Sequence, residues 1–310
     1  MQENSKILRL IYPQWQGGDI AGWFKDMDTK SASQGYILGA QILNLLVDSI
    51  KDSKMQLESK SPQNIVTIDI SRDFIESRKD AKEGIIDKEI LQVQTRLALE
   101  ILNAKKPQKI LTLGGECSVS IAPFSYLAHI YSGELAVIWL DAHPDIGLPH
   151  DTFYQGYHAM AVSALLGKRN KNARFDLQKD FGLPTIIESS KILLAGLNSN
   201  EATHFAERVK DFGLSALSAK DVSQDSNKVL SWLQKSGVKK VAIHLDLDVL
   251  DAKELYVAVG NTGALSTTQV ARLINDVASE CEIVALTIAE HFPKVEIMLR
   301  NFLAKLPLIK

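Results

Sequence analysis

A short cluster of acidic and imidazole side chains is the part of this sequence best suited to chemistry. The unbroken apolar run 135–140 leads directly into Asp141, His143 and Asp145, which are spaced two residues apart. Such a run is typical of a strand buried on both faces. On an extended backbone, this spacing turns all three side chains to the same side. Three side chains of these types at the end of a buried strand indicate a metal site.

A second cluster of the same kind follows about a hundred residues later. The apolar run 241–245 leads into Asp246 and Asp248, which again share one face. A single cluster of this type is more often a solvated turn with capping carboxylates. Two clusters, each at the mouth of a buried strand, favour a metal centre instead.

The residue types in the two clusters also indicate which ions they would bind. Carboxylates outnumber soft ligands, which favours hard or borderline divalent ions such as Mn²⁺ over a structural zinc. Four carboxylates carry too much negative charge for one divalent ion, but they fit two ions that share bridging aspartates. Two such ions hold a water between them and lower its pKa toward neutrality. The resulting hydroxide attacks a trigonal carbon, and the ions stabilise the charge that develops.

Strands and helices alternate along the whole chain. Apolar runs predict strands at 6–12, 64–70, 109–113, 135–140, 191–196, 213–217, 239–245 and 283–288. Helical spacing of apolar residues predicts helices at 33–48, 87–102, from 118, 160–166, 200–209, 227–235, 266–280 and 294–303. This order predicts one α/β domain over 1–310, with a doubly wound and mostly parallel sheet of about eight strands. Ligands of such sheets bind outside the carboxyl ends of the strands, where both clusters and Glu290 fall.

Composition and charge narrow the class of protein. The 310 residues have a formal net charge of −2, which gives no electrostatic case for nucleic acid or an anionic membrane as a partner. No run approaches the roughly 18 apolar residues of a membrane span. The two cysteines, Cys117 and Cys281, form no disulfide framework, and the N-terminus lacks the pattern of a signal peptide. We therefore expect a cytoplasmic protein.

Taken together, the motifs resemble those of the ureohydrolase family, which includes arginase, agmatinase and formimidoylglutamase. GGECS, DAHPD and DLDVLD occur in this order and are followed by Glu290 and Pro293. The resemblance spans 109–293. It implies a three-layer α/β/α fold of the arginase type, a binuclear manganese centre and hydrolysis of the C–N bond of a small guanidino or amidino substrate. By analogy it also implies a homo-oligomer.

The same resemblance assigns the metal ligands. Asp141 and Asp246 match the bridging aspartates of the family. Asp145 would bind one ion, and His143 together with Asp248 would bind the other.

Three residues receive catalytic roles from the resemblance. Asp248 would accept a proton, and His158 matches the loop histidine that relays protons to the leaving amine. Glu290 matches the carboxylate that pairs with the substrate guanidinium. Each has a simpler alternative: His158 as a loop histidine hydrogen-bonded to its neighbours, and Glu290 as a solvated strand end.

One departure from the family concerns a metal ligand. The usual motif is GGDHS, whose histidine binds the more buried ion, and Cys117 stands at that position here. A thiolate is softer than Mn²⁺ prefers. Three outcomes are therefore open: Cys117 binds a softer ion, leaves the site weak, or packs as a small buried apolar residue.

Other departures affect the substrate. Arginases have an asparagine where this chain has Gly147, and their Ser-Gly-Asn pattern is replaced by 155–157. In arginases these groups read the α-amino acid end of arginine, so their absence argues against arginine. Phe153, Tyr154 and Tyr157 predict an aromatic pocket wall.

Two alternatives to this hydrolase follow from the same residues. A ureohydrolase-like protein without turnover, with a structural or ligand-sensing role, is motivated by Cys117 and the altered loops. A related metal-dependent amide hydrolase fits the paired aspartate motifs less well.

Overall fold

The fold is built around an eight-stranded parallel sheet. The computed structural model describes residues 7–50, 64–74, 81, 83–171 and 174–308. Its strands are β1 (Ile7–Tyr12), β2 (Ile65–Thr67), β3 (Lys109–Gly114), β4 (Ala136–Leu140), β5 (Ile192–Leu197), β6 (Ser215–Ser218), β7 (Lys240–Asp246) and β8 (Glu282–Ala289). Their order across the sheet is β2-β1-β3-β8-β7-β4-β5-β6, and every pair is parallel. The predicted fold class is confirmed, although Lys6, the first residue of the first predicted strand, lies outside the described residues.

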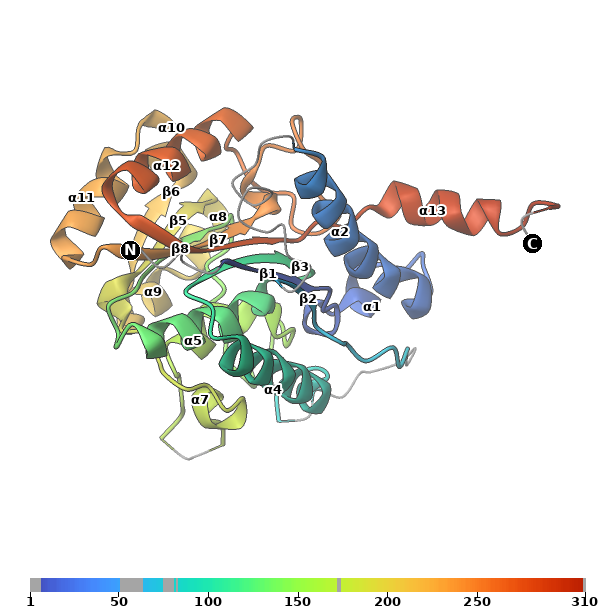
Figure 1. Ribbon diagram of the computed structural model, residues 1–310, viewed down its shortest axis with the longest axis horizontal. Coiled ribbons are helices and arrows are strands. Elements are labelled where there is room, and N and C mark those ends of the chain that lie inside the picture. The colour runs from blue at the N-terminus through green and yellow to red at the C-terminus, as the bar shows by residue number, and fades with distance from the viewer. Residues whose placement is uncertain (1–6, 51–63, 75–80, 82, 172–173, 309–310) are drawn as a thin grey trace.

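Helices cover both faces of the sheet. The helices of the described residues are α1 (Ile20–Trp23), α2 (Thr29–Ser49), α4 (Lys88–Lys105), α5 (Ile121–Ile130), α6 (Ala161–Leu165), α7 (Leu177–Asp180), α8 (Ser199–His204), α9 (Ala206–Phe212), α10 (Ala219–Gln224), α11 (Asn227–Ser236), α12 (Thr267–Glu280) and α13 (Lys294–Leu303). Figure 1 shows α10, α11 and α12 on one side of the sheet, and α4 and α5 on the other. The predicted three-layer arrangement is therefore present.

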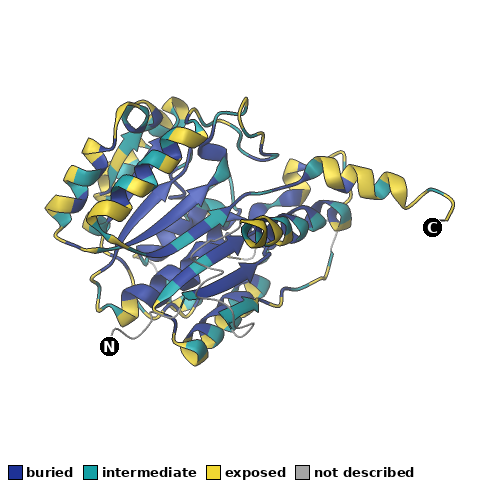
Figure 2. Ribbon diagram, turned by 45° about the horizontal axis from the view of Figure 1, so that its top comes forward, coloured by how far each residue is buried: buried dark blue, intermediate teal, exposed yellow. Residues whose placement is uncertain are grey.

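The alternation of side chains along β4 explains why this strand is apolar throughout. Val137 and Trp139 pack into the core under α4 and α5, whereas Ile138 and Leu140 pack into the core under α11 and α12. A strand covered on both faces needs apolar residues at every position. Figure 2 shows the central strands as the most deeply buried part of the chain.

The register of the sheet brings the polar clusters together. Leu140 at the end of β4 pairs with Leu245 of β7, which pairs with Ile288 of β8. Leu113 of β3 pairs with the same Ile288. The carboxyl ends of these four neighbouring strands are therefore level, and the residues that follow them meet at one edge of the sheet.

Two helix boundaries show what capping does in this chain. Ser266 and Gln269 form the reciprocal hydrogen bonds of a capping box at the start of α12, as the S-x-x-Q pattern predicts. The prediction that Asp87 caps the helix at 87–102 is wrong. Asp87 has a φ of 57°, and its side chain makes no capping hydrogen bond to α4. The predicted helix 200–209 is in fact the pair α8 and α9, interrupted at Phe205.

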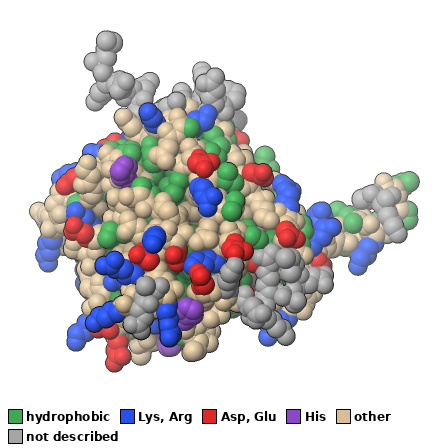
Figure 3. All heavy atoms as spheres, turned by 90° about the horizontal axis from the view of Figure 1, so that it is seen from below, with side chains coloured by type: hydrophobic (Ala, Val, Ile, Leu, Met, Phe, Trp, Pro, Cys, Tyr) green, Lys and Arg blue, Asp and Glu red, His purple; other side chains and the backbone are tan. Residues whose placement is uncertain are grey.

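The C-terminal helix α13 projects from the body of the molecule (Figure 1), and most of its surface is exposed (Figure 2). Its exposed apolar side chains are Val295, Met298, Leu299, Phe302 and Leu303. On the face seen in Figure 3, acidic and basic side chains are interspersed. Along the described ranges, no helix combines the length and the apolar character needed to cross a membrane.

Candidate metal centre

The first predicted cluster lies in a bend after β4. The strand ends at Leu140, and the next residues turn away from the sheet, so the predicted extended backbone through Asp145 is wrong. Asp145 has a φ of 48°, in the left-handed region where Asp and Asn are among the best tolerated residues. Asp141 Oδ1 accepts a hydrogen bond of 2.6 Å from the backbone N–H of His143, which holds the bend.

The second cluster is positioned by the end of β7. Asp246 is the last residue of the strand and caps a 3₁₀ helix (Leu247–Val249) by accepting a hydrogen bond of 2.7 Å from Asp248 N. This tight turn directs Asp248 toward the bend that follows the neighbouring strand β4. The backbone N–H of Ala142 in that bend donates to Asp248 Oδ1 at 3.3 Å.

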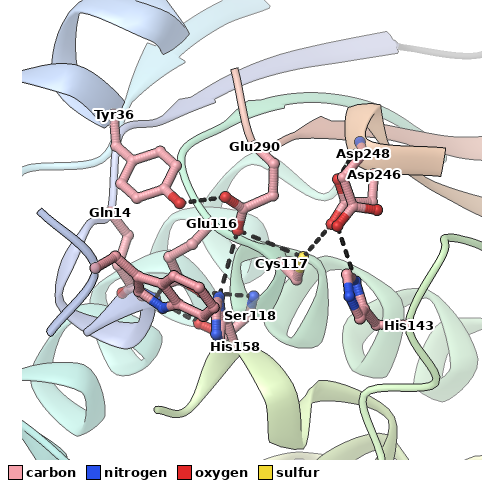
Figure 4. Close-up of polar contacts among 12 residues, drawn as sticks. Gln14, Tyr36, Glu116, Cys117, Ser118, His143, His158, Asp246, Asp248 and Glu290 are labelled. Carbon is pink, nitrogen blue, oxygen red and sulfur yellow. Dashed lines mark hydrogen bonds and ion pairs between the residues drawn. The ribbon is translucent and has the colours of Figure 1, made fainter. Parts of the chain in front are cut away.

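One group of candidate ligands combines both clusters. Ligand atoms of Asp141, His143 and Asp248 all lie within 4.8 Å of one another. His143 Nδ1 is 2.8 Å from Asp248 Oδ2 and 3.5 Å from Asp141 Oδ1 (Figure 4 shows the first of these contacts). These two carboxylates raise the pKa of His143 far above its ordinary value, although burial opposes them. The group presents oxygen and imidazole donors, which suit Mn²⁺.

Cys117 lies within the cluster, in a 3₁₀ helix (Cys117–Ser120) that follows β3. Its Sγ donates to Asp246 Oδ2 at 3.0 Å and approaches Glu290 Oε1 at 3.6 Å (Figure 4). Burial raises the pKa of the Cys117 thiol well above its ordinary value, and the charge of Asp246 raises it further. The sulfur therefore carries a proton unless a cation neutralises the surrounding carboxylates.

The buried carboxylates fit a site for cations. Asp141, Asp145 and Asp246 are each at most 7% exposed. Burial is the largest cause that raises the pKa of each, followed by the charges of the neighbouring aspartates. Asp145 Oδ2 is buried and has no hydrogen-bond partner. Carboxylates with these properties are stabilised by metal ions, which supply the missing positive charge.

His244 belongs to the same cluster, although the sequence analysis did not single it out. It lies on β7 two residues before Asp246, so both side chains point to the same face of the sheet. The imidazole is fully buried and stacks on the ring of Trp139 at 3.7 Å between centroids. Burial lowers the pKa of His244 to about 4, so the ring is neutral. Its spacing from Asp246 is a signal that would have found it.

Glu290 and His158 face each other beside this cluster. His158 Nδ1 lies 3.5 Å from Glu290 Oε1, and Glu290 Oε2 accepts a hydrogen bond from the hydroxyl of Tyr36 (Figure 4). Glu290 is 2% exposed, so it is not a solvated strand end. The Glu290 contacts raise the pKa of His158, although burial alone would lower it. Tyr36 comes from α2, and no local sequence pattern distinguishes it from a core residue.

Glu116, beside Cys117 in the motif, points away from the metal ligands. Its carboxylate accepts hydrogen bonds from Gln14 Nε2 at 2.7 Å and from Ser118 N and Oγ, both at 2.8 Å. These contacts fix the loop that carries Cys117. Gly115 is needed in this loop, because a Cβ there would lie 1.9 Å from the carbonyl oxygen of Gln14.

A cavity of about 310 Å³ opens next to the candidate ligands. Apolar and aromatic side chains form much of its wall: Trp23, Phe153, Tyr154, Met160 and Phe205. Glu201 adds a carboxylate. The predicted aromatic wall is thus present for Phe153 and Tyr154 but wrong for Tyr157, which is 1% exposed and stacks on Phe181 in the core. At Gly147 a Cβ would lie 2.8 Å from the carbonyl oxygen of Ala159, so the loop is packed too closely for a side chain.

The fold is an all-parallel α/β fold whose carboxylates and imidazoles gather at the carboxyl ends of its central strands, an arrangement suited to binding metal ions. A profile described as the Arginase family matches residues 47–303. This chain therefore belongs to the arginase family, whose members are hydrolases that normally bind a binuclear metal site. The resemblance to the ureohydrolases is confirmed at this level.

Individual relatives agree with this assignment. An arginase of Staphylococcus aureus (strain MRSA252) is 24% identical over 214 residues, 67% of each chain. Human arginase-1 is 31% identical over 159 residues, which are 50% of this chain and 48% of that protein. Among solved structures, Entamoeba histolytica arginase in complex with L-ornithine has a TM-score of 0.69 at 17% identity, over 94% of this chain and 92% of that one. Bacillus caldovelox arginase has a TM-score of 0.67 at 19% identity, over 98% and 99%.

Proposed function

We propose that this protein hydrolyses a C–N bond of a small guanidino or amidino compound with the help of two divalent metal ions. The observation that carries the proposal is the position of Asp141 in two groups of candidate ligands, one with His143 and Asp248 and one with Cys117 and Asp145. A carboxylate shared in this way is what two neighbouring ions require. When bound, the ion pair supplies a water nucleophile at neutral pH and stabilises negative charge on the substrate.

Mn²⁺ is the proposed ion at the position formed by Asp141, His143 and Asp248. Carboxylate oxygens and one imidazole match its preference for hard and borderline ligands. Asp246, which lies between this position and Cys117, is the second proposed bridge. Its carboxylate accepts from Asp248 N and from Cys117 Sγ, so it borders both positions.

Glu290 is the proposed anchor of the substrate cation. Its Oε2 is held by Tyr36, and its backbone N–H donates to Gly115 O at 2.7 Å. Its φ of 67° is strained for glutamate, and strained conformations of this kind concentrate at functional sites. A carboxylate held in this way accepts two parallel hydrogen bonds from a planar amidinium group.

Asp248 and His158 are the proposed proton carriers. Asp248 is 3% exposed and lies against His143, where its carboxylate can accept a proton from the attacking water. His158 lines the cavity and contacts Glu290, so it is close to the amine that leaves the substrate. Proton transfer by positioned side chains contributes about 10²–10⁴-fold to rate.

For the remainder of the substrate, we propose an apolar or cationic tail in place of the α-amino acid end of arginine. The proposal is supported by the wall formed by Phe153, Met160 and Phe205 and by the carboxylate of Glu201. Gly147 provides no side chain that could bind an α-carboxylate or α-amino group.

The test is reconstitution followed by a substrate panel. Protein treated with chelator is reloaded with Mn²⁺ and assayed for urea, ammonia or amine release from agmatine, 4-guanidinobutyrate, phenylguanidine, an amidine and arginine. We expect hydrolysis of at least one compound, preference for agmatine or phenylguanidine over arginine, and loss of activity in Glu290→Gln. Absence of hydrolysis of every compound by protein with two bound ions would refute the hydrolase. Preference for arginine would refute the proposed substrate class alone.

A protein without turnover is the second candidate, and Cys117 is the observation that favours it. The Cys117 hydrogen bond to Asp246 occupies a carboxylate oxygen that a metal ion would use. Cys117→His distinguishes the two candidates. A large gain in hydrolysis would mean that Cys117 impairs the site, whereas an active wild-type protein would refute this candidate.

A homo-oligomer and a cytoplasmic location complete the proposal. The projecting helix α13 exposes Val295, Met298 and Phe302, which a second copy of the chain would cover. Sedimentation of the wild type against a Met298→Glu/Phe302→Glu variant tests this, and a monomeric wild type would refute it. The proposed location follows from the presence of only two cysteines, Cys117 and Cys281, which form no disulfide framework.

A further inference from the structure

We propose that His244 binds the more buried metal ion together with Cys117, so that β7 supplies the imidazole that the Cys117 position lacks. This inference rests on the proposed metal centre. The arrangement differs from the resemblance discussed above, which places a histidine at the Cys117 position and assigns no role to the His244 position.

The geometry of four side chains carries the inference. One ligand atom each from Cys117, Asp141, Asp145 and His244 lies within 4.8 Å of the other three. Bonds of about 2.0–2.3 Å to a tetrahedral ion separate its ligand atoms by about 3.3–3.8 Å. His244 Nε2 is 3.9 Å from Asp141 Oδ2, which already approaches this spacing. A small contraction of the cluster would therefore close it around one ion.

Unpartnered atoms give a second and independent observation. His244 Nε2 and Asp145 Oδ2 are both buried, and neither has a hydrogen-bond partner. An unpaired polar atom in the interior costs about 1–3 kcal/mol. A cation placed between the imidazole nitrogen and the carboxylate oxygen would satisfy both atoms at once.

The other nitrogen of the ring is held as in known metal sites. His244 Nδ1 lies 2.8 Å from Ser120 Oγ. When Nδ1–H donates to this oxygen, the lone pair of Nε2 is free and faces the carboxylates. Ligating histidines characteristically make such a contact through their second nitrogen, because it fixes the tautomer and the ring orientation.

Packing alone does not account for an imidazole at this position. The ring stacks on Trp139 with an interplanar angle of 13°, and Trp139 Nε1 donates to Asp141 Oδ2 at 3.0 Å. A phenyl ring in place of His244 would lose the contact with Ser120 Oγ, but it could stack in the same way and would bury no unpaired nitrogen. The imidazole is explained if its Nε2 binds an ion.

The donor set has a consequence for the choice of metal. A thiolate and an imidazole beside the carboxylates suit a borderline ion such as Zn²⁺, Co²⁺ or Fe²⁺ better than Mn²⁺. The Cys117 proton would be released to solvent as the Sγ–metal bond forms. The two positions of the centre would thus differ in their metal preference.

Titration with Co²⁺ tests the inference without an activity assay. Full-length protein stripped with chelator receives Co²⁺ alone, and absorption reports the thiolate-to-cobalt band and the intensity of the visible bands. We expect the thiolate band to saturate with the first equivalent in the wild type and in His129→Phe, a control at an exposed position of α5. His244→Phe, which preserves the stack on Trp139, should bind this equivalent at least about a hundredfold more weakly. Cys117→Ser should lack the band.

Wild-type affinity and an unchanged spectrum in His244→Phe would overturn the inference, as would absence of a thiolate band in the wild type. Should His244→Phe fail to fold, X-ray absorption of wild-type protein with one equivalent of Zn²⁺ decides. One sulfur and one imidazole on the same ion are expected, and sulfur without imidazole would overturn the proposal.

The inference and the proposed function can fail independently. If the wild type with two bound ions hydrolyses a substrate but His244→Phe binds Co²⁺ as the wild type does, only the inference is refuted. If the wild type with two bound ions is inactive but the Co²⁺ spectra are as expected, only the proposed function is refuted.

Discussion

Replacing Asp145 by asparagine should stabilise the metal-free protein and destabilise the metal-loaded protein. Asp145 is 7% exposed, and its Oδ2 has no hydrogen-bond partner. Asparagine has nearly the same shape, tolerates the φ of 48° and carries no charge. The substitution therefore changes the electrostatics of the site while leaving the backbone little disturbed.

The magnitude follows from the burial of the carboxylate. An unsatisfied buried polar group costs about 1–3 kcal/mol, and a charged group costs more. Asparagine still buries an unpartnered polar atom, so only the extra cost of the charge is relieved. In the presence of chelator, Asp145→Asn should therefore raise the free energy of unfolding by about 1–2 kcal/mol in neutral buffer. With free metal ion at a hundred times its dissociation constant, the wild type gains about 2.7 kcal/mol, and the variant should lose most of this gain. The order of stability should reverse.

The effect should also depend on pH in a defined direction. Burial, and then the charge of Asp141, raise the pKa of Asp145 in the folded protein. Below the ordinary pKa of about 3.9, Asp145 is protonated in both the folded and the unfolded protein, and its burial costs no charge. As pH rises through the raised folded-state pKa, the unfolded protein loses this proton more readily, so the wild type loses stability. The gain from Asp145→Asn in chelator should be small near pH 4 and should grow toward neutral pH.

Urea unfolding of both proteins, with chelator and with Mn²⁺, measures these free energies. Asp151→Asn is the matched control, since the Asp151 carboxylate is paired with Arg208 at 2.6 Å. It should lower stability by a similar amount with and without metal. If Asp145→Asn were destabilising in chelator, or equally stabilising in both conditions, the assignment of Asp145 to a cation site would be refuted.

Three further predictions concern Glu290, His158 and the packing of α2 at Gly39. Glu290→Gln should lower kcat/KM by at least about tenfold with unchanged metal content. The reason is that removing one partner of a close charge pair costs about 2 kcal/mol or more. A kcat/KM equal to that of the wild type would contradict the role of Glu290 as an anchor. His158→Ala should lower kcat by about 10²–10⁴-fold, and added imidazole should restore part of it, whereas a purely structural role predicts no rescue. Gly39→Ala would place a Cβ 1.7 Å from the carbonyl oxygen of His291. Thermal unfolding should show that the free energy of unfolding falls by about 1–3 kcal/mol. A variant as stable as the wild type would contradict this packing.

Much of the fold could be predicted because the signals are local. Unbroken apolar runs such as Ile138 to Leu140 occur where helices cover both faces of a strand, and all eight predicted strands are present. The capping box at Ser266 depends only on residues three apart, so it too was predictable. Asp87 was not, because its left-handed backbone conformation depends on the segment that precedes α4.

The sequence by itself determined the strands, the order of the motifs and the ligand-type side chains Asp141 and Asp246, because a strand and the residues at its end are specified within a few positions. Only the tertiary structure decided which of these side chains meet. The strand order β3-β8-β7-β4 is set by packing between segments far apart in the chain, and it brings Cys117 and His244 to the same cluster. The packing of α2 adds Tyr36, which donates to Glu290. These contacts join residues up to 254 positions apart, a separation over which no local pattern carries information.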